Sequence, residues 1–391
     1  MTTSRFETGE MPGYFDESHD LLRAAARAFL AREIAPHVDA WEDAEEFPRA
    51  LYRKAAEAGL LGLGYPESLG GAGGDVFHGI AVTEELMRCG SIGLLAGLFS
   101  LNIALPPIVA LGTEEQKRRF LPPVLAGEKI AALAVTEPNA GSDVANIQTR
   151  ARREGDWYIV NGAKTFITSG CRADLITTVV RTGPEGSDGI SLLVIEKECP
   201  GFSVAKKMKK MGWNASDTAE LVFQDCRVPA ANLIGAEGAG FEGLMVNFQH
   251  ERLALAVLAH AAAHVAYEKA LEYANTRRAF GRPLVGFQVT RHKLADMATR
   301  VAAARAFNYD VAAKVQAGEY PVTEVSMAKN FACEVCDRVA YDAVQLHGGY
   351  GCAREYMVER LYRDTRILSI GGGTTEVMNE IICKFLGIGA T

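Results

Sequence analysis

One short segment, residues 134–143, carries residue types that suit contact with a flat, polar cofactor. It reads Ala-Val-Thr-Glu-Pro-Asn-Ala-Gly-Ser-Asp and sets two hydroxyl groups among small residues. Glycine and alanine let a ligand approach the backbone closely, while threonine and serine hydroxyls rotate to donate hydrogen bonds. The segment therefore favours a cofactor edge, although an ordinary exit from a strand into a loop would use the same residue types.

A second segment far downstream makes the first one more specific. Residues 345–351 read Gln-Leu-His-Gly-Gly-Tyr-Gly, and Arg354-Glu355, Glu359-Arg360 and Arg363-Asp364 follow. The two segments, in this order, resemble the two signatures of the acyl-CoA dehydrogenase family. Cys352 departs from the second signature, where the family usually has a larger apolar residue. The resemblance extends over nearly the whole chain, from about residue 15 to residue 387.

Composition and charge narrow the class of protein. The chain has 391 residues, of which 48% are apolar and 23% charged, as expected for a soluble globular protein of two or three domains. A formal net charge of −7 argues against nucleic acid as a partner, because phosphate binding needs a basic face. No run approaches about 18 uninterrupted apolar residues, so no membrane span is expected.

The cysteines and the N-terminus predict a cytoplasmic location. The eight cysteines are scattered through a chain large enough to fold without disulfides. Glu7 and Glu10 make the N-terminus acidic, unlike a signal or transit peptide. Cys333 and Cys336 form a CxxC pair inside a helical run, without a second pair of ligands, so no metal site is expected.

Hydrophobic periodicity divides the chain into three parts. Residues 1–130 have helical spacing, residues 131–240 contain short strands, and residues 241–391 are helical again. Three strands are expected at 175–181, 190–196 and 220–224. Asn161-Gly162, between two apolar runs, predicts the turn of a β-hairpin.

The last part contains four helical patterns. They cover residues 241–276, 289–316, 322–346 and 375–385, with short links that favour an antiparallel bundle. We therefore expect an α+β fold: an N-terminal all-α domain (1–130), a middle β-barrel domain (131–240) and a C-terminal four-helix bundle (241–391). The same order of domains is implied by the resemblance.

The resemblance implies a particular reaction. A base takes the α-proton of an acyl-CoA thioester, and FAD accepts the β-hydride at N5, since no side chain accepts a hydride. Many family members carry the base before a Gly-Thr pair near the C-terminus, but that position is Gly372 here. Other members, such as long-chain, isovaleryl and citronellyl types, carry it on the first bundle helix. That site reads Gln249-His250-Glu251-Arg252, which makes Glu251 the expected base.

The resemblance also assigns binding residues position by position. Those expected to contact FAD are Leu133, Val135, Thr136, Ser142, Phe166, Thr168, Arg277, Phe280, Gln288, Gln345, Leu346, His347, Gly348, Gly349, Thr374, Thr375 and Glu376. Those expected at the acyl-CoA are Ser142, Gln249, Arg252, Gly371 and Gly372. Phe166 replaces a more common tryptophan and Thr375 a frequent asparagine, and plain core packing is the alternative for Phe166. The small residues at 371 and 372 favour a long or methyl-branched acyl chain, although Gly371 equally suits a turn.

Partners follow from the same resemblance. Arg277, Phe280 and Gln288 would reach the FAD of a neighbouring subunit, which implies a homodimer or homotetramer. An electron-transfer flavoprotein would accept the electrons. Two other functions remain open: an oxygen-using flavin oxidase or monooxygenase of the same fold, and a non-catalytic binding or assembly protein, for which the absent glutamate at 372 would be the main argument.

Overall fold

The computed structural model describes residues 13–389, so Glu7 and Glu10 lie outside the described residues. Its contacts group the chain into two compact units. Within the described residues, the helical unit consists of residues 13–38, 74–95 and 252–389. The sheet unit consists of Asp39–Gly73 and Ala96–Glu251. The division into three consecutive domains stays a prediction.

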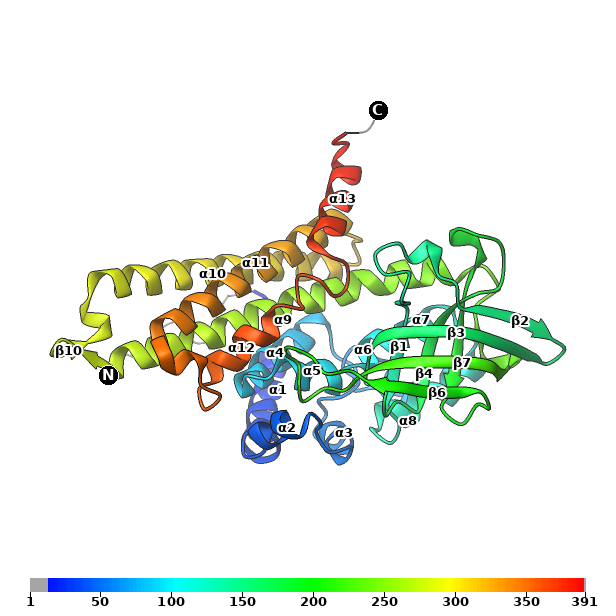
Figure 1. Ribbon diagram of the computed structural model, residues 1–391, viewed down its shortest axis with the longest axis horizontal. Coiled ribbons are helices and arrows are strands. Elements are labelled where there is room, and N and C mark those ends of the chain that lie inside the picture. Colours follow the sequence, from blue (N-terminus) through cyan, green and yellow to red (C-terminus); the bar gives the residue numbers. More distant parts are fainter. Residues whose placement is uncertain (1–12, 390–391) are drawn as a thin grey trace. The chain divides into compact units, whose positions relative to one another are not determined.

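The sheet unit is built on one eight-stranded sheet (Figure 1). Its order is β6-β7-β3-β2-β4-β5-β8, and β1 pairs with β4 in parallel. The strands are β1 (Ala131–Ala134), β2 (Arg150–Glu154), β3 (Trp157–Thr168), β4 (Leu175–Arg181), β5 (Ile190–Glu196), β6 (Phe202–Lys207), β7 (Thr218–Pro229) and β8 (Leu233–Ile234). The helices of this part are α2 (Val38–Ala44, of which Asp39 onward belongs here), α3 (Ala50–Glu57), α5 (Ile92–Leu98, of which Ala96 onward belongs here), α6 (Leu101–Ala104), α7 (Pro106–Leu111) and α8 (Glu114–Leu125). The predicted bounds of β4 and β5 are confirmed.

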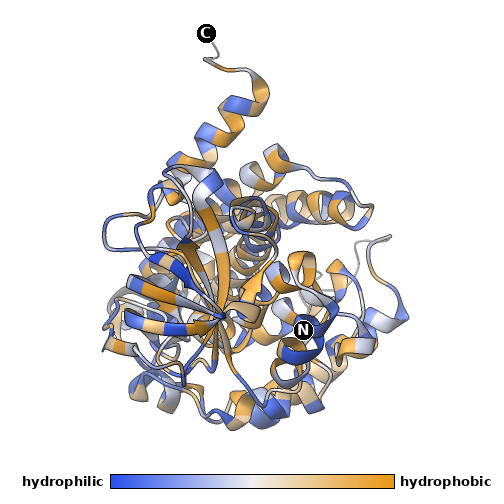
Figure 2. Ribbon diagram, turned by 90° about the vertical axis from the view of Figure 1, so that its right-hand side faces the viewer, coloured by the Kyte–Doolittle hydropathy of each residue, from blue (hydrophilic) through white to orange (hydrophobic). Residues whose placement is uncertain are grey.

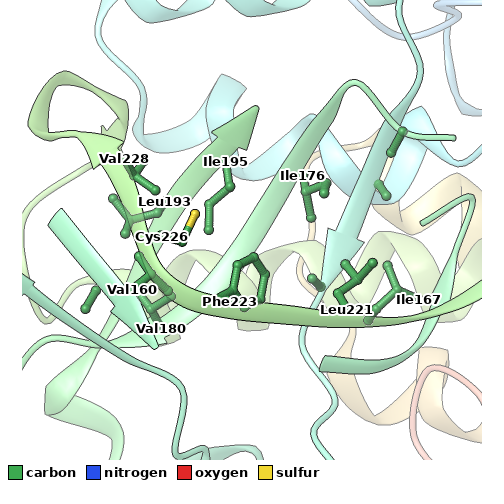
Figure 3. Close-up of a cluster of buried hydrophobic side chains, with 14 of the residues drawn as sticks. Val160, Ile167, Ile176, Val180, Leu193, Ile195, Leu221, Phe223, Cys226 and Val228 are labelled. Carbon is green, nitrogen blue, oxygen red and sulfur yellow. The ribbon is translucent and has the colours of Figure 1, made fainter. Parts of the chain in front are cut away.

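The core of this sheet is aliphatic. Every residue of β4 is buried, which is why its sequence reads as a continuous apolar run rather than an alternating one. Ile176, Val180 and Leu193 pack there with Leu221 and Phe223 of β7 (Figure 3). Cys226 is part of the same cluster.

The Asn161-Gly162 pair is not a hairpin turn, and that prediction was wrong. β3 runs through both residues, and the register of β3 against β7 shifts between Val160 and Gly162, as at a β-bulge. The hairpin exists, but Glu154 of β2 faces Trp157 of β3, so the turn is Gly155-Asp156. Gly162 has φ of 152° and lies against Thr149, which explains the glycine by close approach of two backbone segments.

The helical unit contains the long helices near the C-terminus (Figure 1). Its helices are α1 (Glu17–Phe29), α4 (Val76–Leu86), α9 (Gly240–Thr276, of which Arg252 onward belongs here), α10 (Gln288–Gln316), α11 (Val322–His347), α12 (Met357–Thr365) and α13 (Thr375–Leu386). The four predicted bundle helices are confirmed to within a residue or so at each end. The short α12 was not predicted.

A buried ion cluster joins four helices of this unit. Arg23 of α1 contacts Glu84 of α4 at 2.7 Å, and His260 of α9 contacts the same carboxylate at 3.0 Å. The Tyr309 hydroxyl of α10 also donates to Glu84. Burial alone would raise the pKa of Glu84, but the hydrogen bond and charge of His260, together with Arg23, lower it to about 2. The carboxylate therefore stays charged at neutral pH inside the helix packing.

Two short antiparallel strands, β9 (Arg278–Ala279) and β10 (Arg282–Pro283), connect α9 to α10. At the other end of the unit, α13 carries apolar bands (Figure 2) and ends in half-exposed Phe385 and Leu386. Within residues 13–389 no single helix is long and apolar enough to cross a membrane. One bent pair, Ile92–Leu98 with Leu101–Leu111, meets the length and composition criteria only.

The bulge at Gly162 predicts a difference between two glycine substitutions in the β2–β3 hairpin, one in β3 and one in the turn. An added Cβ at Gly162 would lie 2.7 Å from Thr149 Cα, so Gly162→Ala forces the backbones apart. Gly155, with φ of 59°, has open space around that position, and Gly155→Ala carries only the left-handed strain of about 1–2 kcal/mol. We expect Gly162→Ala to lower the thermal midpoint at least about twice as far as Gly155→Ala, because overpacking adds about 1–3 kcal/mol. Equal decreases in the thermal midpoint of the two variants would contradict a close backbone approach at Gly162.

Candidate active site

The segment leaving β1 is held against β3. The Thr165 N–H of β3 donates to the Thr136 carbonyl at 2.9 Å, so Val135 and Thr136 lie beside the last residues of β3. Leu133, at the end of β1, is buried in the sheet. The structure thus brings together three predicted elements of a cofactor edge: the 133–136 backbone, Phe166 and Thr168.

A buried ion pair holds this arrangement. The Lys164 Nζ lies 2.8 Å from Glu137 Oε1 and 2.9 Å from the Val135 carbonyl, with both charged side chains almost fully buried. Glu137 also accepts the N–H groups of Gln148 and Thr149, which closes the loop after Thr136. The sequence reasoning missed this pair. The signal was a lysine at an inward position of an otherwise apolar strand.

The two charges of the pair respond differently to burial. Burial lowers the pKa of Lys164 to about 8, against the opposing charge of Glu137. Burial alone would raise the pKa of Glu137, but the charge and hydrogen bond of Lys164 hold it below its usual value. Both groups are therefore mostly charged at neutral pH, and neither tolerates loss of its partner.

Phe166 is not a core residue. Strict strand alternation would turn it inward, but β3 shifts register again between Lys164 and Ile167, and Phe166 is 63% exposed. Its φ of 61° is left-handed, which is costly for an aromatic residue. A strained backbone thus keeps an aromatic surface in solvent next to Thr136, the arrangement that a flat ring system would cover. The core-packing alternative for Phe166 is excluded.

The other predicted residues of the sheet unit lie on a loop and on α9. Ser142 is exposed on the loop that Glu137 closes. Gln249 is buried on α9, and its Oε1 has no hydrogen-bond partner among the described residues. Glu251 is half-buried one helical position before Arg252. A buried acceptor such as Gln249 Oε1 fits a polar ligand, because unsatisfied buried polar atoms are rare.

In the helical unit, a glycine loop is pinned by two cations. Arg252 Nε donates to the Gly372 carbonyl at 3.2 Å, and Lys329 Nζ donates to the Gly373 carbonyl at 2.6 Å. Gly372 has φ of 65°, so the turn itself explains this glycine. Gly371 has no left-handed backbone, and an added Cβ would meet only ordinary contacts. The turn explanation therefore applies to Gly372 and not to Gly371.

This glycine loop leads into α13, whose start was predicted to meet the adenosine half of FAD. Thr374 is the N-cap, and its hydroxyl accepts the Val377 N–H. Thr375 is partly buried, and Glu376 is exposed in the first turn. Hydrogen bonds from its own backbone N–H and from Thr374 lower the pKa of Glu376.

The predicted residues near the β9–β10 hairpin are on the surface. Phe280 is 95% exposed with φ of 49°, and its only ring contact is with Phe287 at 6.2 Å among the described residues. The Arg277 guanidinium lies over the ring of Tyr350 at 5.7 Å, which brings it close to the 345–351 segment. Gln288 begins α10 and approaches His292.

The residues of that 345–351 segment divide into exposed and buried ones. Gln345, Gly348 and Gly349 are exposed at the end of α11, and Leu346 is partly buried. His347 is buried, stacks on Tyr273 at 4.2 Å and donates from Nδ1 to the Ala343 carbonyl. Burial lowers the pKa of His347. Its side chain therefore packs the helix end, while the glycine backbone is open to a ligand.

One group of side chains has the spacing of metal ligands, namely His19, Asp75 and His78. Both histidines already serve in capping boxes: His19 with Asp16 at the start of α1, and His78 with Asp75 at the start of α4. These capping roles account for all three residues.

Comparisons with known proteins agree over the whole chain. The family models of the acyl-CoA dehydrogenase N-terminal, middle and C-terminal domains match residues 16–128, 132–226 and 238–387. An acyl-CoA dehydrogenase of Bacillus subtilis is 41% identical over 368 residues, which are 94% of this chain and 97% of that protein. The mitochondrial long-chain specific acyl-CoA dehydrogenase of Sus scrofa is 40% identical over 373 residues (95% and 86%). A probable acyl-CoA dehydrogenase from Mycobacterium abscessus has a similar structure, with a TM-score of 0.94, 54% identity and coverage of 96% and 100%.

The chain belongs to the acyl-CoA dehydrogenase family. The predicted fold, with helical, sheet and helical parts in that order, is confirmed, and so is the class of enzyme. Members of this family are flavoproteins. The exposed, strained Phe166 beside Thr136 fits the ring system of such a cofactor.

In this acyl-CoA dehydrogenase, loss of Lys164 should be severe. Lys164→Met leaves the buried Glu137 carboxylate without its cation, which costs about 3–5 kcal/mol. We expect the double variant Lys164→Met/Glu137→Gln to recover more than half of the fall in thermal midpoint, because it removes the orphaned charge and keeps an acceptor. If the thermal midpoint of the double variant is no higher than that of Lys164→Met, the ion pair does not hold the segment after β1 against β3.

Phe166 predicts a loss of cofactor affinity without a loss of stability. Because the side chain is exposed, Phe166→Ala should leave the thermal midpoint of the apoprotein nearly unchanged. We expect its dissociation constant for FAD, measured by fluorescence titration, to rise about 2- to 12-fold, the equivalent of an aromatic contact of about 0.5–1.5 kcal/mol. Phe385→Ala, another half-exposed phenylalanine, is the control and should bind FAD normally. Unchanged affinity in both variants would exclude Phe166 from the cofactor site.

Proposed function

We propose that this enzyme converts a fatty or branched acyl-CoA thioester to the 2,3-enoyl-CoA, with Glu251 as the base. The observation that carries the assignment is the backbone at Gly372. A left-handed glycine occupies the position that carries the base in many relatives, so no carboxylate is available there. Glu251, on the long helix α9, is the remaining predicted base.

Each residue has a distinct part in the proposed reaction. Glu251 takes the α-proton of the thioester. FAD, when bound, supplies the acceptor for the β-hydride. Thr136 and Ser142 donate hydrogen bonds to the cofactor or the thioester arm, and Phe166 covers one side of the ring system. The orphaned Gln249 Oε1 suits a donor on the substrate, such as a pantetheine N–H.

The supporting observation for the substrate class is Gly371. The backbone at this position does not require glycine, and a larger side chain would fit there. An absent side chain leaves space for bulk near the acyl group, which favours a long or methyl-branched chain.

Further parts of the proposal concern partners and location. We propose at least a homodimer, in which the FAD of a second subunit is reached by Arg277, Phe280 and Gln288. Phe280 is almost fully exposed and has a left-handed backbone. An electron-transfer flavoprotein is proposed as the electron acceptor. Eight free cysteines support a reducing compartment such as the cytoplasm.

The deciding experiment is anaerobic mixing of the FAD-loaded enzyme with a panel of short, long and branched acyl-CoAs while flavin absorbance is followed. We expect bleaching with long or branched chains. Glu251→Gln should retain FAD and bleach at least about 100-fold more slowly, because a positioned base contributes about 10²–10⁴ in rate. Glu272→Gln, on an exposed residue of the same helix, is the matched control and should react normally.

The other outcomes are equally informative. Normal bleaching by Glu251→Gln would overturn the assignment of the base. Rapid peroxide formation from acyl-CoA in air, without another acceptor, would favour the oxidase alternative. Absence of FAD uptake by the purified protein would favour the non-catalytic alternative.

A further inference from the structure

Two cysteines of the sheet unit lie on neighbouring backbone segments, where the turn before β6 runs beside the end of β7. Cys199 follows β5 in a turn, with its N–H bonded to the Glu196 carbonyl at 3.0 Å and its own carbonyl to the Phe202 N–H at 3.1 Å. Cys199 is partly exposed. Cys226, on β7, is fully buried in the aliphatic core of the sheet (Figure 3).

The backbone holds the two cysteines close together. The Arg227 N–H, directly after Cys226, donates to the carbonyl of Pro200, directly after Cys199, at 3.0 Å. Gly201 is pressed so closely on β7 that an added Cβ would lie 2.8 Å from Cys226 Cα. Cys199 also packs against the buried cluster that contains Cys226.

The β3 bulge fixes the position of Cys226. Asp225 has a left-handed φ of 46°, and Asn161 of the bulge both donates to its carboxylate at 3.1 Å and accepts its N–H at 2.8 Å. Cys226 pairs with Val160 at the point where the register shifts. Cys226 lies in the buried core cluster of the sheet, and Cys199 packs against this cluster.

We propose that Cys199 and Cys226 form a reversible disulfide when the enzyme meets a hydroperoxide. The Cys199 thiolate attacks the peroxide O–O bond, takes one oxygen as a sulfenic acid and, with one proton, releases the alcohol or water. The Cys226 thiol then attacks the sulfenic sulfur, an S–S bond forms, and the sulfenic oxygen leaves as water. The two sulfurs lose two electrons together, and the peroxide gains them.

The chemistry of the two thiols suits these roles. The neighbouring Cys226 thiol lowers the pKa of Cys199, although burial and the charges of Glu196 and Glu198 oppose this. The neighbouring Cys199, together with burial, raises the pKa of Cys226. A partly exposed cysteine beside a buried thiol is the arrangement of a reactive cysteine with its resolving partner.

Cys171, also partly exposed in the sheet unit, lacks this arrangement. Burial and the Asp217 carboxylate raise its pKa to about 11, so almost none of it is thiolate at neutral pH. It therefore serves as an internal control for the reactivity of Cys199.

The test uses the FAD-loaded wild-type enzyme, one equivalent of hydrogen peroxide at pH 7, and mass spectrometry of non-reduced peptides. We expect a Cys199–Cys226 cross-linked peptide that dithiothreitol removes. Before oxidation, Cys199 should react with iodoacetamide at least about tenfold faster than Cys171, because its larger thiolate fraction outweighs its lower nucleophilicity. Neither readout depends on acyl-CoA turnover.

Variants separate the two steps. Cys199→Ser should abolish the cross-link, and Cys226→Ala should leave a Cys199 sulfenic acid that dimedone traps. Cys171→Ser should cross-link like the wild type. Preferential oxidation of Cys171 or the exposed Cys352, or over-oxidation of Cys199 without any cross-link in the wild-type protein, would overturn the proposal whether or not the variants fold.

Discussion

The buried contact between Lys164 and Glu137 is the interaction that holds the segment from β1 to Thr136, which we propose as the edge of the cofactor site. Lys164 also holds the Val135 carbonyl, and Glu137 also holds the Gln148 and Thr149 N–H groups. One ion pair therefore ties the exit of β1, the loop after it and the inner face of β3 into a single piece. A buried pair of this kind adds little net stability over apolar residues of the same size. Its value lies in allowing only one arrangement of the segment that carries Thr136.

The two register shifts of β3 give one strand several separate functions. The first, at Gly162, admits Thr149 on one side and anchors Asp225 and Cys226 through Asn161. The second, before Ile167, turns Phe166 out of the sheet and leaves Ile167 in the core. A regular strand could not bury Lys164 and expose Phe166, since both would lie on the same face. Irregular pairing therefore creates the surface that we assign to the flavin.

The sequence predicted the long elements well because their signals are local. The helix bounds in the last part follow from apolar periodicity, and β4 and β5 follow from continuous apolar runs. The short, strongly charged α12 lacked such a run and was missed. Asn161-Gly162 has the residue types of a turn and those of a bulge, and only the partner strand β7 distinguishes the two.

The candidate site was predictable only through its resemblance to a family. Residue types indicated a cofactor edge, but the ion pair of Lys164 and Glu137 depends on a contact between segments far apart in the sequence. The difference between Gly371 and Gly372 was likewise invisible, because it rests on backbone angles and not on composition. From the sequence, Phe166 suited the sheet core and the cofactor site equally well. Only the register of β3 against β7 distinguishes the two.

The left-handed backbone at Gly372 has a consequence for the side chains that this loop accepts. A glutamate placed there in this chain would carry strain of about 1–2 kcal/mol, and the carbonyl contact with Arg252 holds the turn in that conformation. A single substitution at position 372 would therefore add a carboxylate to a loop whose backbone favours glycine. The loop would have to adopt another turn, and give up its contact with Arg252, before a larger side chain became free of strain there.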